Sequence, residues 1–90
     1  MQELNRLEIE EQIKHILISK LMVSKAVLAE SNSTTPLLGH GVGLDSIETL
    51  TLVGALEDEY KIEIDENDLT VDLFKDLGTL AQYILEKVSN

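Results

Sequence analysis

Apolar residues in this chain recur at the spacing of an α-helix in three separate segments. In the first segment, four aliphatic residues fall on one helical face: Ile9, Ile13, Ile16 and Leu17. Charged residues occupy the opposite face, so the pattern predicts an amphipathic helix from about Glu3 to Leu21, and it leaves open a continuation as far as Ala29. Three such helices in 90 residues restrict the chain to a small bundle around a shared apolar core.

A turn-rich stretch interrupts the helical pattern after the first segment. It begins at Ser31–Pro36 and continues through Gly39, Gly41 and Gly43, which keep the chain out of a helix. The stretch is not wholly polar, and four apolar residues are expected to hold it against the bundle: Leu37, Leu38, Val42 and Leu44.

The second helix is expected from Ser46 to about Tyr60. Asp45 and Glu48 have the spacing of a capping box at its start. One residue per turn marks the side that we expect to face the core: Ile47, Leu50, Val53 or Gly54, and Glu57. Leu52 and Leu56 widen that side.

The remaining segments complete the bundle. Ile62–Ile64 alternates like a strand but has no partner run, so we interpret it as a linker whose isoleucines fill the core. A short third helix is expected around Glu66–Leu69 or a little beyond, and a last helix from about Leu77 to Val88. The predicted fold is all-α, a four-helix bundle with three longer helices and one short helix, forming one domain over residues 1–90.

Composition excludes several classes of protein. Aromatic residues make up 3% of the chain, so the core must be aliphatic. There is no cysteine, which excludes disulfides, thiolate metal sites and thiol catalysis. Residues 1–6 do not have a basic-then-apolar export signal, and no apolar run approaches membrane-spanning length. We expect a cytoplasmic monomer with no insertion into membranes.

Negative charge is concentrated in one part of the chain. Residues 45–76 hold eleven acids against Lys61 and Lys75, a net charge of −9 out of a total of −10. Nucleic-acid binding requires clustered lysine and arginine, so it is excluded, and an anionic membrane surface is disfavoured on the same ground. A solvated acidic face is the plainer interpretation, but its position around one serine favours recognition of proteins with basic patches.

Ser46 either caps the second helix or serves a chemical purpose. His15 and His40 are the only candidate bases for a nucleophilic serine, and the elbow pattern G-x-S-x-G is absent around Ser46. A helical domain of this size also has little room for an oxyanion hole. We therefore expect no catalytic residue.

The acidic run Asp65–Asp68 is similar to the start of a calcium-binding loop. Thr70 and Asp76 stand where such a loop requires glycine and glutamate. Helix capping is the better interpretation, and no metal site is expected.

Attachment of a group to Ser46 fits the local pattern better than catalysis. The start of a helix offers free N–H groups and a positive dipole end, which suit a phosphodiester. Leu44–Glu48 resembles the Asp-Ser-Leu attachment motif of acyl carrier proteins, with Ile47 in place of leucine. The resemblance continues through Ala55–Ile64 and ends in Leu80–Ile84, so it covers essentially the whole chain.

The resemblance implies that Ser46 receives 4′-phosphopantetheine from coenzyme A through a separate phosphopantetheinyl transferase, which recognises Asp45. The arm would hold acyl intermediates as thioesters for fatty-acid, polyketide or related specialised lipid biosynthesis, and the protein itself would not be an enzyme. The implied partners are acyl-activating, ketosynthase and acyltransferase-type enzymes with basic docking patches. Docking is expected at Glu48, Thr51, Gly54, Glu57 and Asp58. A pocket for the acyl chain is expected at Leu50, Val53, Leu56, Ile62 and Leu80.

Two positions depart from the pattern of fatty-acid carriers. Such carriers have an acid where Thr51 stands and a larger apolar residue where Gly54 stands. We therefore expect a stand-alone carrier outside primary fatty-acid synthesis. A free-standing aminoacyl or peptidyl-type carrier, or an unmodified carrier fold that acts as an interaction module, remain the alternatives.

Overall fold

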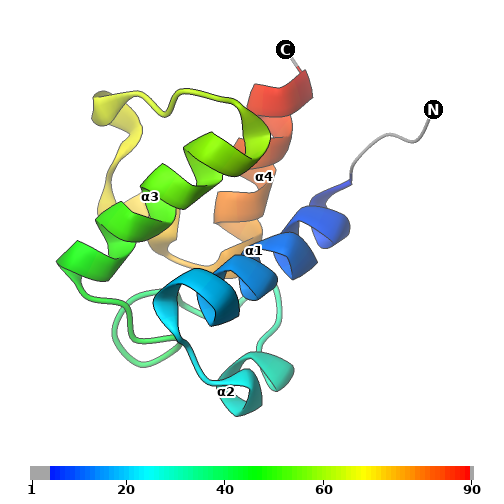
Figure 1. Cartoon of the computed structure of the whole chain (residues 1–90), viewed down its shortest axis with the longest axis vertical. Helices are drawn as coiled ribbons and strands as arrows, with labels where there is room; N and C mark the ends of the chain where they lie inside the picture. The colour runs from blue at the N-terminus through cyan, green and yellow to red at the C-terminus, as the bar shows by residue number, and fades with distance from the viewer. Residues whose placement is uncertain (1–4, 90) are drawn as a thin grey trace.

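The structure is a computed structural model that describes residues 5–89. Within that range, the chain forms four α-helices, two 3-10 helices and no strand (Figure 1). The elements in chain order are α1 (Arg6–Leu21), α2 (Lys25–Ala29), α3 (Ser46–Tyr60), η1 (Glu66–Asp68), η2 (Val71–Phe74) and α4 (Leu77–Ser89). The all-α fold expected from the sequence is confirmed.

The first helix ends at Leu21, as expected, and the continuation to Ala29 that the sequence left open is not part of it. Residue Glu3, where we placed its start, lies outside the described residues, and α1 begins at Arg6 with Asn5 as its N-cap. The helix stops at Leu21 because Met22 turns into the left-handed region, with φ at 60°. The continuation toward Ala29 is therefore a separate short helix, α2, which Ser24 caps through a hydrogen bond from the Ala26 amide.

The expected short helix near Glu66–Leu69 is two 3-10 helices rather than one α-helix. Asp65 caps η1 by accepting a 2.8 Å hydrogen bond from the Asn67 amide. Thr70 then takes an extended conformation, with φ −118° and ψ 165°, and separates η1 from η2. The one short α-helix in the described chain is thus α2, which the sequence pattern did not distinguish from α1.

The core lies where α1 packs against both α3 and α4. Figure 1 shows α1 and α3 running alongside each other in roughly opposite directions, with α4 next to α1. The buried side chains are almost all aliphatic, as expected, and Phe74 is the one aromatic among them in the described part of the chain. The fully buried large residues are Ile9, Ile13, Leu17, Leu37, Leu52, Leu56, Leu77, Leu80 and Ile84.

The orientation of α3 differs from the expected one at its first turns. Ile47 and Leu50 were assigned to the core side, but they are 74% and 63% exposed. The buried stripe of α3 consists of Leu52, Val53 and Leu56. The prediction for Ile47 and Leu50 was wrong because the part of α3 that packs into the core begins only at Leu52.

The long loop before α3 is held at both ends, as its apolar residues suggested. Leu37 is fully buried and Leu44 is 5% exposed, and the Leu44 amide donates to the Leu37 carbonyl at 2.9 Å. Gly43 has φ +81°, a conformation that favours glycine, and it turns the chain toward the start of α3. This closed loop fixes the position of Asp45 and Ser46.

Candidate functional site

Ser46 is the first residue of α3 and its side chain is exposed. The capping of the helix is performed by its neighbour: Asp45 accepts a 2.7 Å hydrogen bond from the Glu48 amide, and the Glu48 carboxylate accepts one of 3.1 Å from the Asp45 amide. The capping box expected from the sequence is therefore present. Within residues 5–89, the Ser46 hydroxyl has no protein hydrogen-bond partner, so it is available for chemistry.

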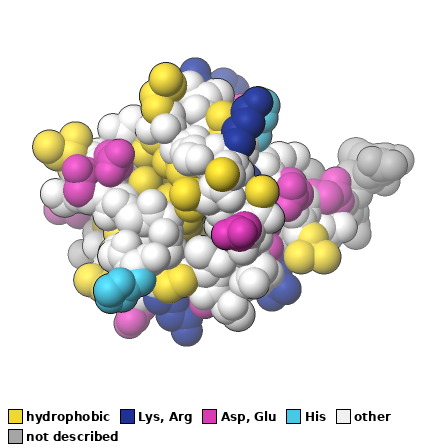
Figure 2. Space-filling view, turned by 90° about the horizontal axis from the view of Figure 1, so that it is seen from below, with side chains coloured by type: hydrophobic (Ala, Val, Ile, Leu, Met, Phe, Trp, Pro, Cys, Tyr) yellow, Lys and Arg dark blue, Asp and Glu magenta, His cyan; other side chains and the backbone are white. Residues whose placement is uncertain are grey.

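An apolar groove of about 440 Å³ begins at Ser46. It runs along α3 and is closed by residues of the long loop and of the segment that carries η1 and η2. Figure 2, in which the molecule is seen from below relative to Figure 1, shows apolar side chains gathered near the centre of that face. The lining residues are Leu38, Leu44, Asp45, Ser46, Thr49, Leu50, Val53, Leu69, Thr70, Val71 and Phe74.

The groove includes two of the five residues that we expected to form an acyl-chain pocket, Leu50 and Val53. Leu56 and Leu80 are fully buried in the core, and Ile62 is half-buried beside it; these three do not line the groove. Sequence reasoning missed the contributions of Leu69 and Val71, although their alternation with polar residues was visible.

The five expected docking residues divide into two groups. Thr51, Gly54 and Asp58 are exposed along one side of α3. Glu48 and Glu57 are half-buried and already bonded within the fold. Glu48 belongs to the cap, and the Glu57 carboxylate accepts a 2.9 Å hydrogen bond from the Ile64 amide.

Exposed apolar residues extend the surface around Ser46. Ile47 follows Ser46 directly, and Leu50 lies one turn further along α3. Val71, 75% exposed, lies across the groove. Their exposure makes the surroundings of the serine hydrophobic as well as acidic, and the periodicity of α3 alone did not indicate this.

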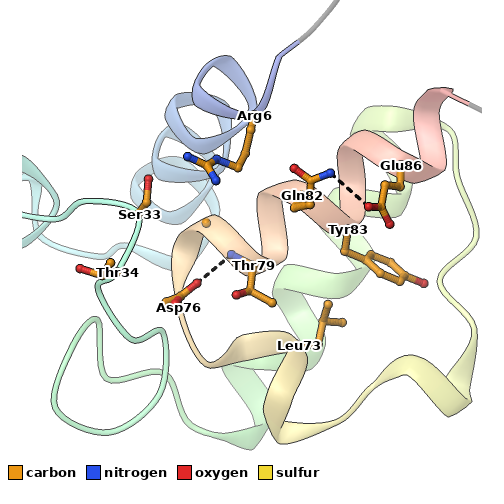
Figure 3. A pocket seen from close by; sticks show the side chains of 10 residues that line it. Arg6, Ser33, Thr34, Leu73, Asp76, Thr79, Gln82, Tyr83 and Glu86 are labelled. Carbon is orange, nitrogen blue, oxygen red and sulfur yellow. Dashed lines mark hydrogen bonds between the residues drawn. The ribbon is translucent and has the colours of Figure 1, made fainter.

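A second hollow of about 520 Å³ lies between α1, the long loop and α4, away from Ser46 (Figure 3). Its polar groups are already used in the fold. Asp76 caps α4 through the Thr79 amide at 2.7 Å, Gln82 bonds Glu86 at 3.1 Å, and Arg6 pairs with the buried Glu10 at 3.2 Å. The groove at Ser46 is therefore the better candidate site, because it joins an unbonded hydroxyl to an apolar recess.

The other candidate chemistry finds little support in the geometry. His15 is exposed on α1 and lines a separate hollow with Glu11 and Glu59, while His40 is exposed in the long loop. Among residues 5–89 no three histidine, aspartate or glutamate side chains are grouped so that they would hold a metal ion. None of the helices described here is long and apolar enough to cross a membrane.

Comparison with known proteins identifies what the chain is similar to. The family model for the phosphopantetheine attachment site matches residues 11–84. An acyl carrier protein of Chlamydia muridarum (strain MoPn / Nigg) is 28% identical over 81 residues, covering 90% of this chain and 97% of that protein. An acyl carrier protein of Cyanidium caldarium is 30% identical over 84 residues, covering 92% of this chain and 90% of that protein. The similarity thus extends well beyond the residues around Ser46.

Proposed function

The chain belongs to the acyl carrier protein family, whose covalent cofactor is 4′-phosphopantetheine, and we propose that Ser46 is the attachment site of that group. The observation that carries the proposal is the unbonded, exposed hydroxyl of Ser46 at the first position of α3. Asp45 performs the capping, so a group on Ser46 would leave the cap intact.

The start of α3 suits a phosphodiester on Ser46 in two ways. The first amides of a helix have no intrahelical acceptor and point toward its N-terminal end, where the dipole is positive. Gly43 precedes the site with no side chain, so an enzyme can approach the serine closely. Asp45 is held beside Ser46 by the capping box, and we propose it as a residue that the phosphopantetheinyl transferase recognises.

The group supplies a long arm with a terminal thiol that holds acyl cargo as a thioester. The residues of this chain bind, shelter and present that cargo rather than transform it, so the protein is proposed to be a carrier and not an enzyme. Leu50 and Val53 face the groove next to Ser46 and are proposed to contact an acyl chain directly. Leu56, Ile62 and Leu80 lie deeper and would contact it only if the core parts.

Partner enzymes are proposed to dock along the exposed side of α3. The eleven acids of residues 45–76 attract basic patches over long range, which steers association. Close contact would fall on Thr51, Gly54 and Asp58, which are exposed. Glu48 and Glu57 are bonded within the fold, so we assign them a smaller share of direct contact.

The particular pathway is proposed to lie outside primary fatty-acid synthesis, in polyketide or related specialised lipid biosynthesis. Thr51 and Gly54 support this, because they remove a charge and a side-chain contact from the exposed side of α3. We propose that the whole chain, residues 1–90, acts as one cytoplasmic domain and as a monomer. If the chain supported elongation as well as a fatty-acid carrier in a reconstituted synthase, the assignment of pathway would be wrong.

Loading of the protein tests the proposed function. Incubation with coenzyme A, Mg²⁺ and a promiscuous phosphopantetheinyl transferase is expected to add the mass of one phosphopantetheine. The Ser46→Ala variant is expected to gain nothing. Absence of a mass gain in the wild type would indicate an unmodified interaction module instead. Subsequent loading assays with purified acyl-activating and aminoacyl-activating enzymes separate an acyl carrier from an aminoacyl or peptidyl-type carrier.

A further inference from the structure

The outer wall of the groove is a segment that the rest of the fold holds loosely. We call residues 65–72 the strap. Its two ends are anchored in the core, because Ile64 precedes it and Leu73 follows it, and each is 7% exposed. Between these anchors no residue of the strap is fully buried, although Leu69 is half-buried against the core. It lines the groove opposite α3 through Leu69, Thr70 and Val71.

The backbone of the strap bonds to itself. The Asp68 amide donates to the Asp65 carbonyl at 2.9 Å and the Leu69 amide to the Glu66 carbonyl at 3.2 Å. Within residues 5–89, backbone-to-backbone hydrogen bonds of the strap reach no further than its immediate neighbours in the chain. The strap can therefore move as a unit without breaking backbone hydrogen bonds to the bundle.

One side-chain hydrogen bond joins the middle of the strap to the bundle. The Tyr83 hydroxyl on α4 donates to the Asp68 carboxylate at 2.7 Å. In Figure 3 the Tyr83 ring extends from α4 with its hydroxyl directed away from the neighbouring hollow. The Lys87 ammonium lies 5.6 Å from the centre of the ring and steadies it. Burial and the hydrogen bond to Asp68 raise the pKa of Tyr83 to about 12, so the hydroxyl remains a donor at neutral pH.

We propose that the hydrogen bond between Tyr83 and Asp68 is a latch that holds the strap against the bundle and sets how readily the groove beside Ser46 opens. Opening would widen the apolar recess between Leu50 and Val71 and give access toward Phe74. Tyr83 is in this view a positioning residue. The consequence for acyl cargo rests on the proposed carrier function, whereas the latch itself is a property of the unmodified protein.

Amide hydrogen exchange on the unmodified protein tests the latch. A hydrogen bond to a carboxylate protects a segment from local opening, so Tyr83→Phe is expected to speed exchange at Asp68, Leu69 and Thr70 roughly tenfold. Exchange within α1 is expected to stay unchanged. Tyr60→Phe is the matched control, because the Tyr60 hydroxyl donates to Gln12 on α1 and does not touch the strap.

Variants of the acceptor separate a latch from general loosening. Asp68→Asn keeps an oxygen that accepts from Tyr83, so it is expected to retain most of the protection. Asp68→Ala is expected to speed exchange in the strap as much as Tyr83→Phe does. The double variant should exchange no faster than either single variant, because both changes remove the same hydrogen bond. The latch is wrong if Tyr83→Phe leaves exchange of the strap within twofold of the wild type, or if Tyr60→Phe loosens the strap equally.

Binding of a neutral apolar dye, N-phenyl-1-naphthylamine, tests the opening of the groove without any group on Ser46. If the dye binds only a minor open state, the apparent affinity of the protein for the dye rises by the same factor as the population of that state, roughly tenfold in Tyr83→Phe. Unchanged dye binding in a variant whose strap has loosened would overturn the gating role. If exchange and dye binding respond as expected while Ser46 accepts no phosphopantetheine, the latch stands and the carrier function fails.

Discussion

Replacement of Gly54 by alanine is expected to stabilise this protein while weakening its use by partner enzymes. Gly54 lies in the interior of the 15-residue helix α3, where glycine costs about 1 kcal/mol relative to alanine. Apart from the adjoining backbone of its own helix, a Cβ atom placed at Gly54 meets nothing within 4 Å, so no packing in the fold opposes it. The free energy of unfolding should therefore rise by about 1 kcal/mol, which corresponds to an increase in Tm of about 4–8 °C for a domain of this size.

Urea unfolding followed by circular dichroism measures the change, because a single small domain is expected to unfold in one cooperative transition. Gly78→Ala is the matched control in α4. A Cβ atom there would lie 3.0 Å from the Ser33 carbonyl oxygen and 3.1 Å from its Cβ, where α4 and the long loop meet. Any gain in helix propensity in this first turn of α4 should then be offset by crowding, and Gly78→Ala is expected to be no more stable than the wild type.

The functional half of this prediction concerns transfer to a cognate partner. A methyl group at Gly54 fills space that a docked partner enzyme would occupy on the exposed side of α3. The KM of that partner for the loaded carrier should therefore rise, even though the carrier itself is more stable. If Gly54→Ala is neutral or destabilising, the glycine serves the fold itself. The proposal that it serves a partner would then lose its basis.

Three further predictions concern α3 and the two tyrosines. Asp45→Ala removes the capping side chain and should lower the free energy of unfolding by about 1 kcal/mol in urea titration. Glu57→Ala should lower the free energy of unfolding by about 1.5 kcal/mol, because it leaves the Ile64 amide without its acceptor. Asp58→Ala should change the free energy of unfolding by less than about 0.5 kcal/mol, and its main effect should be slower association with a basic partner at low salt. The pKa of each tyrosine is raised from 10.0 to about 12, mainly by burial. The charge of Glu59 also raises the pKa of Tyr60, and the hydrogen bond to Asp68 also raises the pKa of Tyr83. Between pH 10 and 12 the folded chain keeps protons that the unfolded chain has lost, so the free energy of unfolding should fall as the pH rises through this window. Ultraviolet titration of the phenolates should show midpoints near 12 in the folded protein, and midpoints near 10 would contradict the structure.

The sequence predicted the helices well wherever apolar spacing was regular. The start of α3 at Ser46 and its end at Tyr60 agree with the structure because Asp45 and Glu48 form a capping box and Lys61 turns into the left-handed region. The end of α1 at Leu21 was expected too, but the sequence left open whether the helix continues to Ala29. Met22 takes a left-handed conformation, which methionine does not favour, so the sequence alone did not show that α1 and α2 are separate helices.

The environment of the candidate site was only partly predictable for a related reason. Helical periodicity indicates which residues share a face, but it does not tell which part of that face a neighbouring helix covers. Ile47 and Leu50 have the spacing of core residues, and yet they remain exposed, while the buried part of α3 begins at Leu52. The groove likewise depends on Val71 and Phe74, which belong to the 3-10 helix η2, and no periodic pattern in the sequence predicted that helix.

The central claim, that Ser46 carries the phosphopantetheine arm, is tested most directly by locating the modified residue after treatment with coenzyme A and a phosphopantetheinyl transferase. Fragmentation mass spectrometry should place the group on Ser46 alone. Ser24 caps α2 and is exposed, so Ser24→Ala is a matched control that should be modified like the wild type, while Ser46→Ala should not be modified. Modification at another residue, or equal modification of Ser46→Ala, would contradict the claim.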